Sequence, residues 1–136
     1  MFKLLRSRED VTAFIPRVVE ASNAERNAFG FLPSPTYEDF AYQGRIIIAV
    51  DAATEEFAGY AIFAGALPTA KVRQTYVAPN WRRKGLGQKL VAEVIKACEE
   101  IGYLSITATV ASNLTDANAF YESLGFTAFL EKPGGK

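Results

Sequence analysis

The apolar positions at the start of the chain predict a short strand followed by one amphipathic helix. Residues 2–5 are expected to form the strand. Ser7, followed by Asp10, resembles a capping box, which marks the start of a helix. The apolar residues that come next recur at the spacing of a single buried helix face, which predicts one continuous helix: Val11, Phe14, Ile15, Val18 and Val19.

The middle of the chain predicts a β-hairpin after a less regular stretch. Between residues 24 and 44 the periodicity is weak, although Ser34 and Pro35 could open a short helix, because proline is favoured in the first helical turn. Residues 45–51 are rich in isoleucine and predict a strand, and residues 57–64 predict its hairpin partner across a turn at residues 51–54. Gly59 is tolerated within the second strand or at a bulge.

Strands and helices alternate in the second half. Strands are expected at residues 71–77, 104–110 and 126–130, and helices at residues 86–101 and 115–124. Gly102 and Gly125 follow the two helices and are typical of helix ends. The complete order predicts a mixed α/β (α+β) fold with helices on both faces of the sheet.

Composition fits an ordinary globular domain and removes several kinds of chemistry. The 136 residues are 49% hydrophobic and 22% charged, and 15 basic residues balance 15 acidic ones. The absence of histidine excludes a histidine-based triad and a histidine-rich zinc site, so no metal is expected. The single cysteine, Cys98, permits no internal disulfide and is expected to lie in the core. Neither a signal peptide nor a membrane-spanning run is recognisable, so we expect a cytoplasmic protein without a membrane partner.

One segment between a strand and a helix has the character of an anion site. It reads YVAPNWRRKGLGQ over residues 76–88. Glycines at the mouth of a helix let a ligand approach the backbone, and the first-turn N–H groups and the helix dipole attract negative charge. Arg82, Arg83 and Lys84 add positive charge, so a diphosphate is the expected ligand. The dinucleotide fingerprint and the nucleoside-triphosphate loop are both absent.

Two motifs in this sequence resemble those of the GNAT N-acetyltransferases. Arg82-x-x-Gly85-x-Gly87 is similar to the R/Q-x-x-G-x-G/A motif with which that family holds the pyrophosphate of coenzyme A. Asn113, followed by ANAFYESLGF over residues 117–126, resembles the family's second signature. The resemblance covers about residues 2–130. It implies a mostly antiparallel central sheet that splays between strands four and five.

The resemblance also implies acetyl-CoA as the cosubstrate, a primary amine as the acceptor, and direct attack in a ternary complex. The resemblance places Tyr121 at the family position of the general acid. A phenol has an ordinary pKa near 10, so at neutral pH it carries the proton that a departing thiolate needs. The residues expected to bind the cosubstrate are Tyr76, Val77, Arg82, Arg83, Lys84, Gly85, Leu86, Gly87, Gln88 and Asn113.

Several of these residues also have structural interpretations. Tyr121 could be a core aromatic of its helix, Asn113 a helix cap, and residues 82–84 a solvated charge run. Trp81 is expected to pack over the turn rather than to contact substrate. The general base is left open, because residues 71–77 contain no carboxylate and a water chain could serve; the nearby carboxylates are Glu25, Glu38, Asp39, Glu55 and Glu56.

Residues 1–131 are expected to form one acetyltransferase domain and residues 132–136 a tail or the start of a linker. The final strand of such domains is missing from the pattern, so a longer chain or a homodimer would complete the sheet. The alternative function is a catalytically weak acyl-CoA-binding module or a regulatory domain of a longer protein. Residues 24–44 are expected to line the acceptor groove, and the acceptor itself, whether protein, aminoacyl-tRNA or small molecule, stays open.

Overall fold

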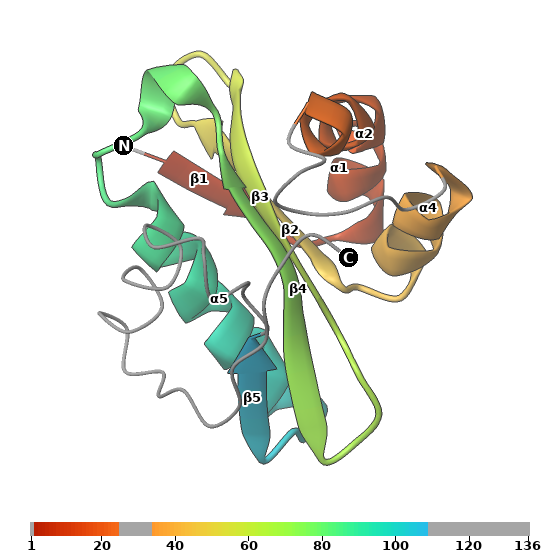
Figure 1. The fold of residues 1–136 in the computed structure, drawn as a ribbon. Coiled ribbons are helices and arrows are strands. Elements are labelled where there is room, and N and C mark those ends of the chain that lie inside the picture. The colour runs from red at the N-terminus through yellow and green to blue at the C-terminus, as the bar shows by residue number, and fades with distance from the viewer. Residues whose placement is uncertain (1, 25–33, 109–136) are drawn as a thin grey trace.

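The computed structural model describes residues 2–24 and 34–108, which form one sheet covered by helices (Figure 1). The strands lie in the order β1-β2-β3-β4-β5, antiparallel except for β5, which runs parallel to β4. The strands are β1 (Phe2–Leu5), β2 (Ile46–Asp51), β3 (Phe57–Ala64), β4 (Thr69–Val77) and β5 (Ser105–Ala108). The helices are α1 (Arg8–Thr12), α2 (Ile15–Ala24), α4 (Ser34–Tyr42), the 3-10 turn η1 (Pro79–Trp81) and α5 (Leu86–Ile101).

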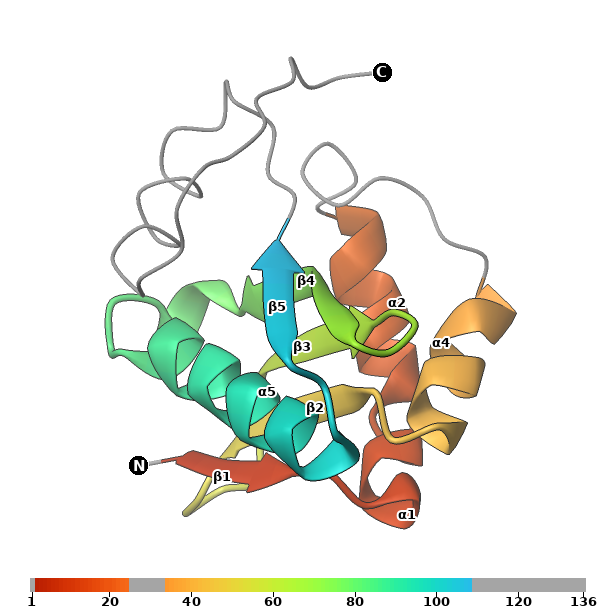
Figure 2. The ribbon, with the colours of Figure 1, turned by 90° about the horizontal axis from the view of Figure 1, so that it is seen from below.

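Helices cover both faces of the sheet, as the sequence predicted. Figure 2 shows α5 on one face and α1, α2 and α4 on the other. This arrangement explains why β2 and β3 are buried almost throughout instead of alternating, since neither face of these central strands meets water. On the α5 side, Leu90 and Val94 pack against Phe63 and Val72. On the other side, Val18 of α2 and Tyr37 of α4 pack with Ile48 in a second cluster.

The single helix predicted for residues 11–19 is wrong, because the structure contains two helices there. α1 ends at Thr12 and α2 begins at Ile15. Pro16 gives the physical reason: it has no N–H to donate to the Thr12 carbonyl, and its ring crowds that carbonyl. The buried face is nevertheless kept, with Val11 and Val18 at most 1% exposed. The predicted start is confirmed, since the Asp10 N–H donates to Ser7 Oγ at 3.2 Å.

The other predicted boundaries agree closely within the described residues. α4 contains Pro35 at its second position, and α5 begins and ends where the periodicity placed it. Gly102 closes α5 in the left-handed conformation, at φ 113°. β4 starts earlier than predicted, at Thr69. The predicted helix at 115–124, the strand at 126–130 and the tail at 132–136 lie outside the described residues.

The β2–β3 hairpin contains an extra residue beside Gly59. Ala49 pairs with Gly59 whereas Val50 pairs with Phe57, so Ala58 is the bulged residue. Gly59 itself is required by the next strand, because a Cβ at this position would lie 2.3 Å from the Tyr76 carbonyl oxygen. Gly59 therefore lets β4 approach β3 closely at the end of the sheet where the candidate site begins.

Candidate functional site

The site is built around a bulge in β4. Ile62 pairs with Gln74 and Phe63 pairs with Val72, so Arg73 is the extra residue. The bulge reverses which side chains face which layer: Val72 packs with the α5 cluster, whereas Tyr76 packs with the α2 and α4 cluster. The described pairing of β4 with β5 ends at Val72, just before the bulge.

The carboxyl end of β4 leads into a turn with two left-handed residues. Arg83 has φ 65° and Gly85 has φ 79°. Gly85 is the N-cap of α5, and a Cβ built there meets no described atom within 4 Å, so none of the residues that the structure describes fills the space before the helix. This open approach is what a bulky anion would need.

The first turn of α5 presents backbone donors to that space. The Lys89 N–H donates to the Gly85 carbonyl at 3.2 Å and begins the helical ladder. The N–H groups of Leu86, Gly87 and Gln88 precede that bond, and no side chain in the described part of the chain caps them. The Leu86 side chain is only 1% exposed, so its part in a site is limited to its backbone. Together with the helix dipole, these donors favour an anion.

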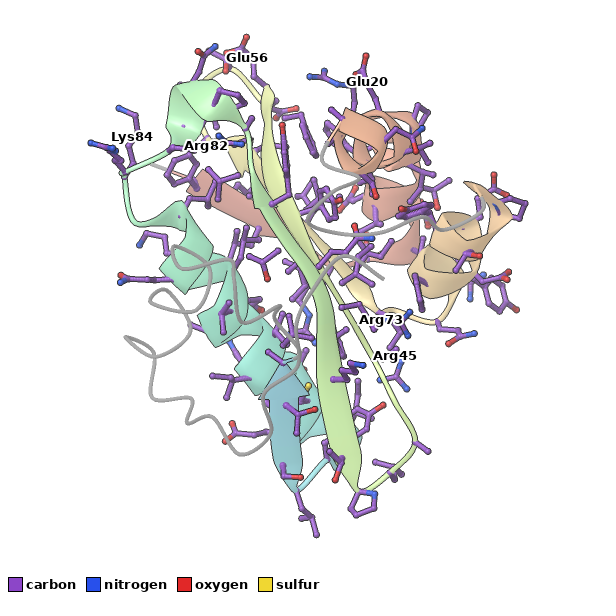
Figure 3. All side chains as sticks on the ribbon, viewed as in Figure 1. Glu20, Arg45, Glu56, Arg73, Arg82 and Lys84 are labelled. Carbon is purple, nitrogen blue, oxygen red and sulfur yellow. The ribbon has the colours of Figure 1, made fainter. Side chains whose placement is uncertain are left out.

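The three basic residues of the turn differ in what they contact. Arg82 Nε donates to the Val77 carbonyl at 2.8 Å, and its guanidinium lies 5.9 Å from the centre of the Tyr76 ring. Figure 3 shows Arg82 against the end of β4 and Lys84 extending away from the turn. Arg83 and Lys84 are exposed. Arg82 therefore fixes the strand end, and Arg83 and Lys84 supply the outward positive charge.

Aromatic side chains pack on the two sides of this turn. Tyr76 stacks on Tyr60 with ring centres 5.6 Å apart and on Phe57 at 6.4 Å. Trp81 packs edge-on against Phe2 at 5.7 Å and lies against the α5-side core. The packing role predicted for Trp81 is thus confirmed, with Phe2 and the α5-side core as its partners.

Cys98 has the structural role that the sequence predicted. It is 1% exposed and belongs to the α5-side core. Burial raises the pKa of its thiol, while the positive charge of Arg45 lowers it to a smaller extent. A buried thiol with a raised pKa is a poor nucleophile.

The carboxylates considered as bases lie at the surface where they are described. Glu55 pairs with Lys3 at 3.5 Å, Glu56 is exposed just before β3 (Figure 3), and Glu38 and Asp39 are exposed on α4. Neither β4 nor the described β5 contains a carboxylate. The candidate acid Tyr121, the candidate ligand Asn113 and Glu25 lie outside the described residues.

Sequence reasoning missed Gln74, a polar residue that the bulge turns into the core of the α2 and α4 side. It is 2% exposed and accepts a hydrogen bond from the Tyr60 hydroxyl. The sequence offered one clue: Gln74 is a carboxamide residue within a predicted strand, where apolar and polar side chains are expected to alternate between the two faces.

The sequence model of the acetyltransferase (GNAT) family matches residues 15–126. This span contains β4, the turn and α5, together with most of the rest of the chain. The chain belongs to this family. Within the described residues of this GNAT protein, no helix is long and apolar enough to cross a membrane, and no acidic, histidine or cysteine cluster could hold a metal.

Similar proteins agree with this assignment. The chain is 34% identical over 74 residues to the [ribosomal protein bS18]-alanine N-acetyltransferase of Salmonella typhimurium. The matched segment covers 54% of this chain and 50% of the relative. The chain thus spans about half the length of this curated relative. The crystal structure of the ribosomal-protein-S18-alanine N-acetyltransferase from Escherichia coli has a TM-score of 0.74 at 23% identity, covering 96% of this chain and 80% of that one. The crystal structure of Rv2747 from Mycobacterium tuberculosis, in complex with CoA and NLQ, has a TM-score of 0.80 at 13% identity. The match covers 98% of this chain and 76% of that one. The two structures share the GNAT fold.

Proposed function

We propose that this protein transfers the acetyl group of acetyl-CoA to a primary amine. The observation that carries the proposal is the uncapped N-terminus of α5, opened by a left-handed Gly85 at the end of a strand. Such a terminus suits a pyrophosphate. Membership of the GNAT family and a relative that is an N-acetyltransferase support the same chemistry.

In this proposal, the backbone N–H groups from Gly85 to Gln88 hold the pyrophosphate, with charge from Arg83 and Lys84. The pantetheine lies along β4 as an added strand. The Tyr76 carbonyl lies against Gly59 of β3, and the Val77 carbonyl accepts from Arg82 on the opposite side. Because backbone groups alternate between the two sides of a strand, the Val77 N–H also faces the side of β4 away from β3, where it would polarise the thioester carbonyl.

The acceptor that we propose is the α-amine of a protein N-terminus. An α-amine has a pKa near 7.8, against about 10.4 for lysine, so at pH 7.5 about a third of it is already neutral, compared with about 0.1% of lysine. Such an acceptor depends least on a general base to remove its proton. This suits a chain without histidine, in which β4 and the described β5 contain no carboxylate. The relative that acts on an alanine of a ribosomal protein supports this acceptor class and a cytoplasmic place of action.

The chemical step is attack of the neutral amine on the thioester carbonyl. As the C–S bond of the tetrahedral intermediate breaks, the CoA sulfur takes up a proton and the former amine nitrogen loses one to water, so that an amide and the CoA thiol are formed. We propose that the Tyr121 hydroxyl donates the proton that the sulfur takes up. This assignment rests on the motif, in which the tyrosine precedes Leu124-Gly125-Phe126. Residues 24–44, which include α4, are assigned to the acceptor side.

Thiol release tests this function. We expect acetyl-CoA to release CoA in the presence of a peptide that begins with alanine, and much less with the same peptide blocked at its N-terminus and containing an internal lysine. Binding of acetyl-CoA without release from any peptide, lysine peptide or small amine would favour the acyl-CoA-binding module instead.

Tyr121→Phe tests the acid. We expect kcat to fall by about tenfold or more, since general acid catalysis contributes on the order of 10²–10⁴. The Kd of acetyl-CoA should stay within about twofold, because the phenyl ring is kept. Equal kcat values for the two proteins would show that another group protonates the thiolate.

A further inference from the structure

Four buried polar side chains form a hydrogen-bonded chain on the sheet face that α2 and α4 cover. The Tyr60 hydroxyl donates to Gln74 Oε1 at 2.6 Å, and Gln74 Nε2 donates to the Tyr37 hydroxyl at 3.5 Å. The Tyr37 hydroxyl in turn donates to Ser22 Oγ at 2.5 Å. These contacts connect β3 and β4 to both helices.

We call this chain the Gln74 network (Ser22, Tyr37, Tyr60 and Gln74), and it lies in the core on the α2 and α4 side of the sheet. Each member is at most 2% exposed. Among residues 2–24 and 34–108, Ser22 and Gln74 are the buried polar or charged side chains, and both belong to it. A polar group stays in an apolar core only when its partners are fixed, so the network imposes one relative position on the elements that it joins.

The network joins β4 just after the bulge, where the side chains of the strand have switched between the two faces of the sheet. Gln74 is the first residue after the Arg73 bulge. Its carboxamide is directional, because one end accepts from β3 and the other donates to α4. The Tyr60 ring stacks on Tyr76, and the Tyr76 ring also lies near the Arg82 guanidinium. The contacts thus run from α2 and α4 to the strand end beside the anion site.

We propose that Gln74 is a positioning residue for acetyl transfer. This inference rests on the proposed function, in which the thioester lies along β4 and the acceptor meets it from the α4 side. Gln74 contacts neither substrate. It holds the segment of β4 after the bulge at a fixed position relative to α4, so that the amine and the thioester meet in a productive geometry. A misplacement on the order of 1 Å can reduce a rate by about 100-fold.

The test compares hydrogen-bond deletions inside and outside the network. Gln74→Met keeps the length of the side chain but removes both hydrogen bonds, and Tyr60→Phe is a milder change that removes one. The matched control is Tyr103→Phe, since Tyr103 is also buried and its hydroxyl donates to the Gly65 carbonyl in the loop between β3 and β4. The full chain is assayed with acetyl-CoA and the peptide that begins with alanine, and the melting temperature and the Kd of acetyl-CoA are measured alongside.

All three variants should lose some thermal stability, by roughly 3–10 °C. The two network variants leave a buried polar group unpaired, and Tyr103→Phe removes the hydrogen bond to the Gly65 carbonyl. For Gln74→Met and Tyr60→Phe we expect kcat/KM for the peptide to fall about tenfold or more, with the Kd of acetyl-CoA within about twofold. Tyr103→Phe should keep kcat/KM within about twofold.

A merely structural role would give the opposite pattern. If both network variants lose stability as Tyr103→Phe does but keep the wild-type kcat/KM, the positioning role is overturned. Should Gln74→Met not fold, Tyr60→Phe decides by the same criterion. A wild-type protein that binds acetyl-CoA but acetylates no peptide overturns the proposed function and the positioning role together, and the wild-type assay reveals this before any variant is compared.

Discussion

At the scale of single residues, two glycines have the same backbone conformation, so substitutions at them distinguish an effect on stability from an effect on acetyl-CoA binding. Gly85 and Gly44 have φ values of 79° and 75°, and a Cβ at either meets no described atom within 4 Å. Any other residue therefore meets the same backbone cost at both positions, roughly 1–2 kcal/mol. Only Gly85 stands before the donors of α5.

Gly85→Glu should consequently abolish or greatly weaken acetyl-CoA binding. The carboxylate places bulk and negative charge where the pyrophosphate is expected, so we predict at least about a tenfold rise in Kd. Gly44→Glu is the control and should lose similar stability while keeping the wild-type Kd. Calorimetric titration of the two variants provides the comparison; equal Kd values would remove the pyrophosphate from this turn.

Asp51 gives a pH-dependent prediction at the same scale. The backbone N–H of Thr54 donates to its carboxylate at 2.9 Å and holds the pKa of Asp51 below its ordinary value. A lowered folded-state pKa stabilises the protein above the unfolded value of about 3.9, and this stabilisation is lost as the pH falls through the folded-state pKa.

Asp51→Ala should therefore lower the urea midpoint at pH 7, and the difference from wild type should shrink as the pH falls below about 4. Asp39→Ala, at an exposed position on α4, is the control and should have little effect at either pH. A difference between Asp51→Ala and wild type that is the same at pH 7 and pH 3 would contradict this account of the turn.

At the scale of elements, the periodicity of apolar residues located the described strands and helices, but it did not predict the helix break or the strand bulge. The spacing of Val11, Ile15 and Val18 identified the buried face, yet Pro16 divides the helix that carries it. The Arg73 bulge was equally hidden, because a bulge depends on the pairing of two strands and not on one strand's pattern. Since the bulge turns Gln74 into the core, the same limit concealed the Gln74 network.

Close contact between β3 and β4 leads to a prediction at this scale. Gly59→Ala would place a Cβ 2.3 Å from the Tyr76 carbonyl oxygen, so β4 must shift. We expect a loss of roughly 1–3 kcal/mol in the free energy of unfolding and weaker acetyl-CoA binding, because the displaced segment holds Tyr76 and Val77.

The control for this variant lies at the other end of the same hairpin. A Cβ at Gly65 would come within 2.7 Å of the Thr69 carbonyl oxygen, so Gly65→Ala also forces a backbone shift. It should destabilise the protein and leave the Kd of acetyl-CoA unchanged. Denaturant unfolding with calorimetry distinguishes the two. The assignment of β4 as the pantetheine strand fails if Gly59→Ala binds as tightly as Gly65→Ala.

At the scale of the whole molecule, the order of elements was sufficient to predict a sheet with helices on both faces. The motif at residues 82–87 then predicted the end of the sheet where the candidate site lies, because its glycines and basic residues suit an anion only between a strand and a helix. The roles within the motif needed the structure: Arg82 contacts the Val77 carbonyl, and Leu86 is buried. Side-chain direction in a turn follows from packing, which a linear pattern does not contain.

The measurement that tests the central claim most directly is calorimetric titration of the intact protein with acetyl-CoA. We predict saturable one-to-one binding with a micromolar Kd, weakened by added salt because positive charge at the turn contributes. The absence of binding by correctly folded wild-type protein would contradict the assignment of the α5 N-terminus as an acetyl-CoA site.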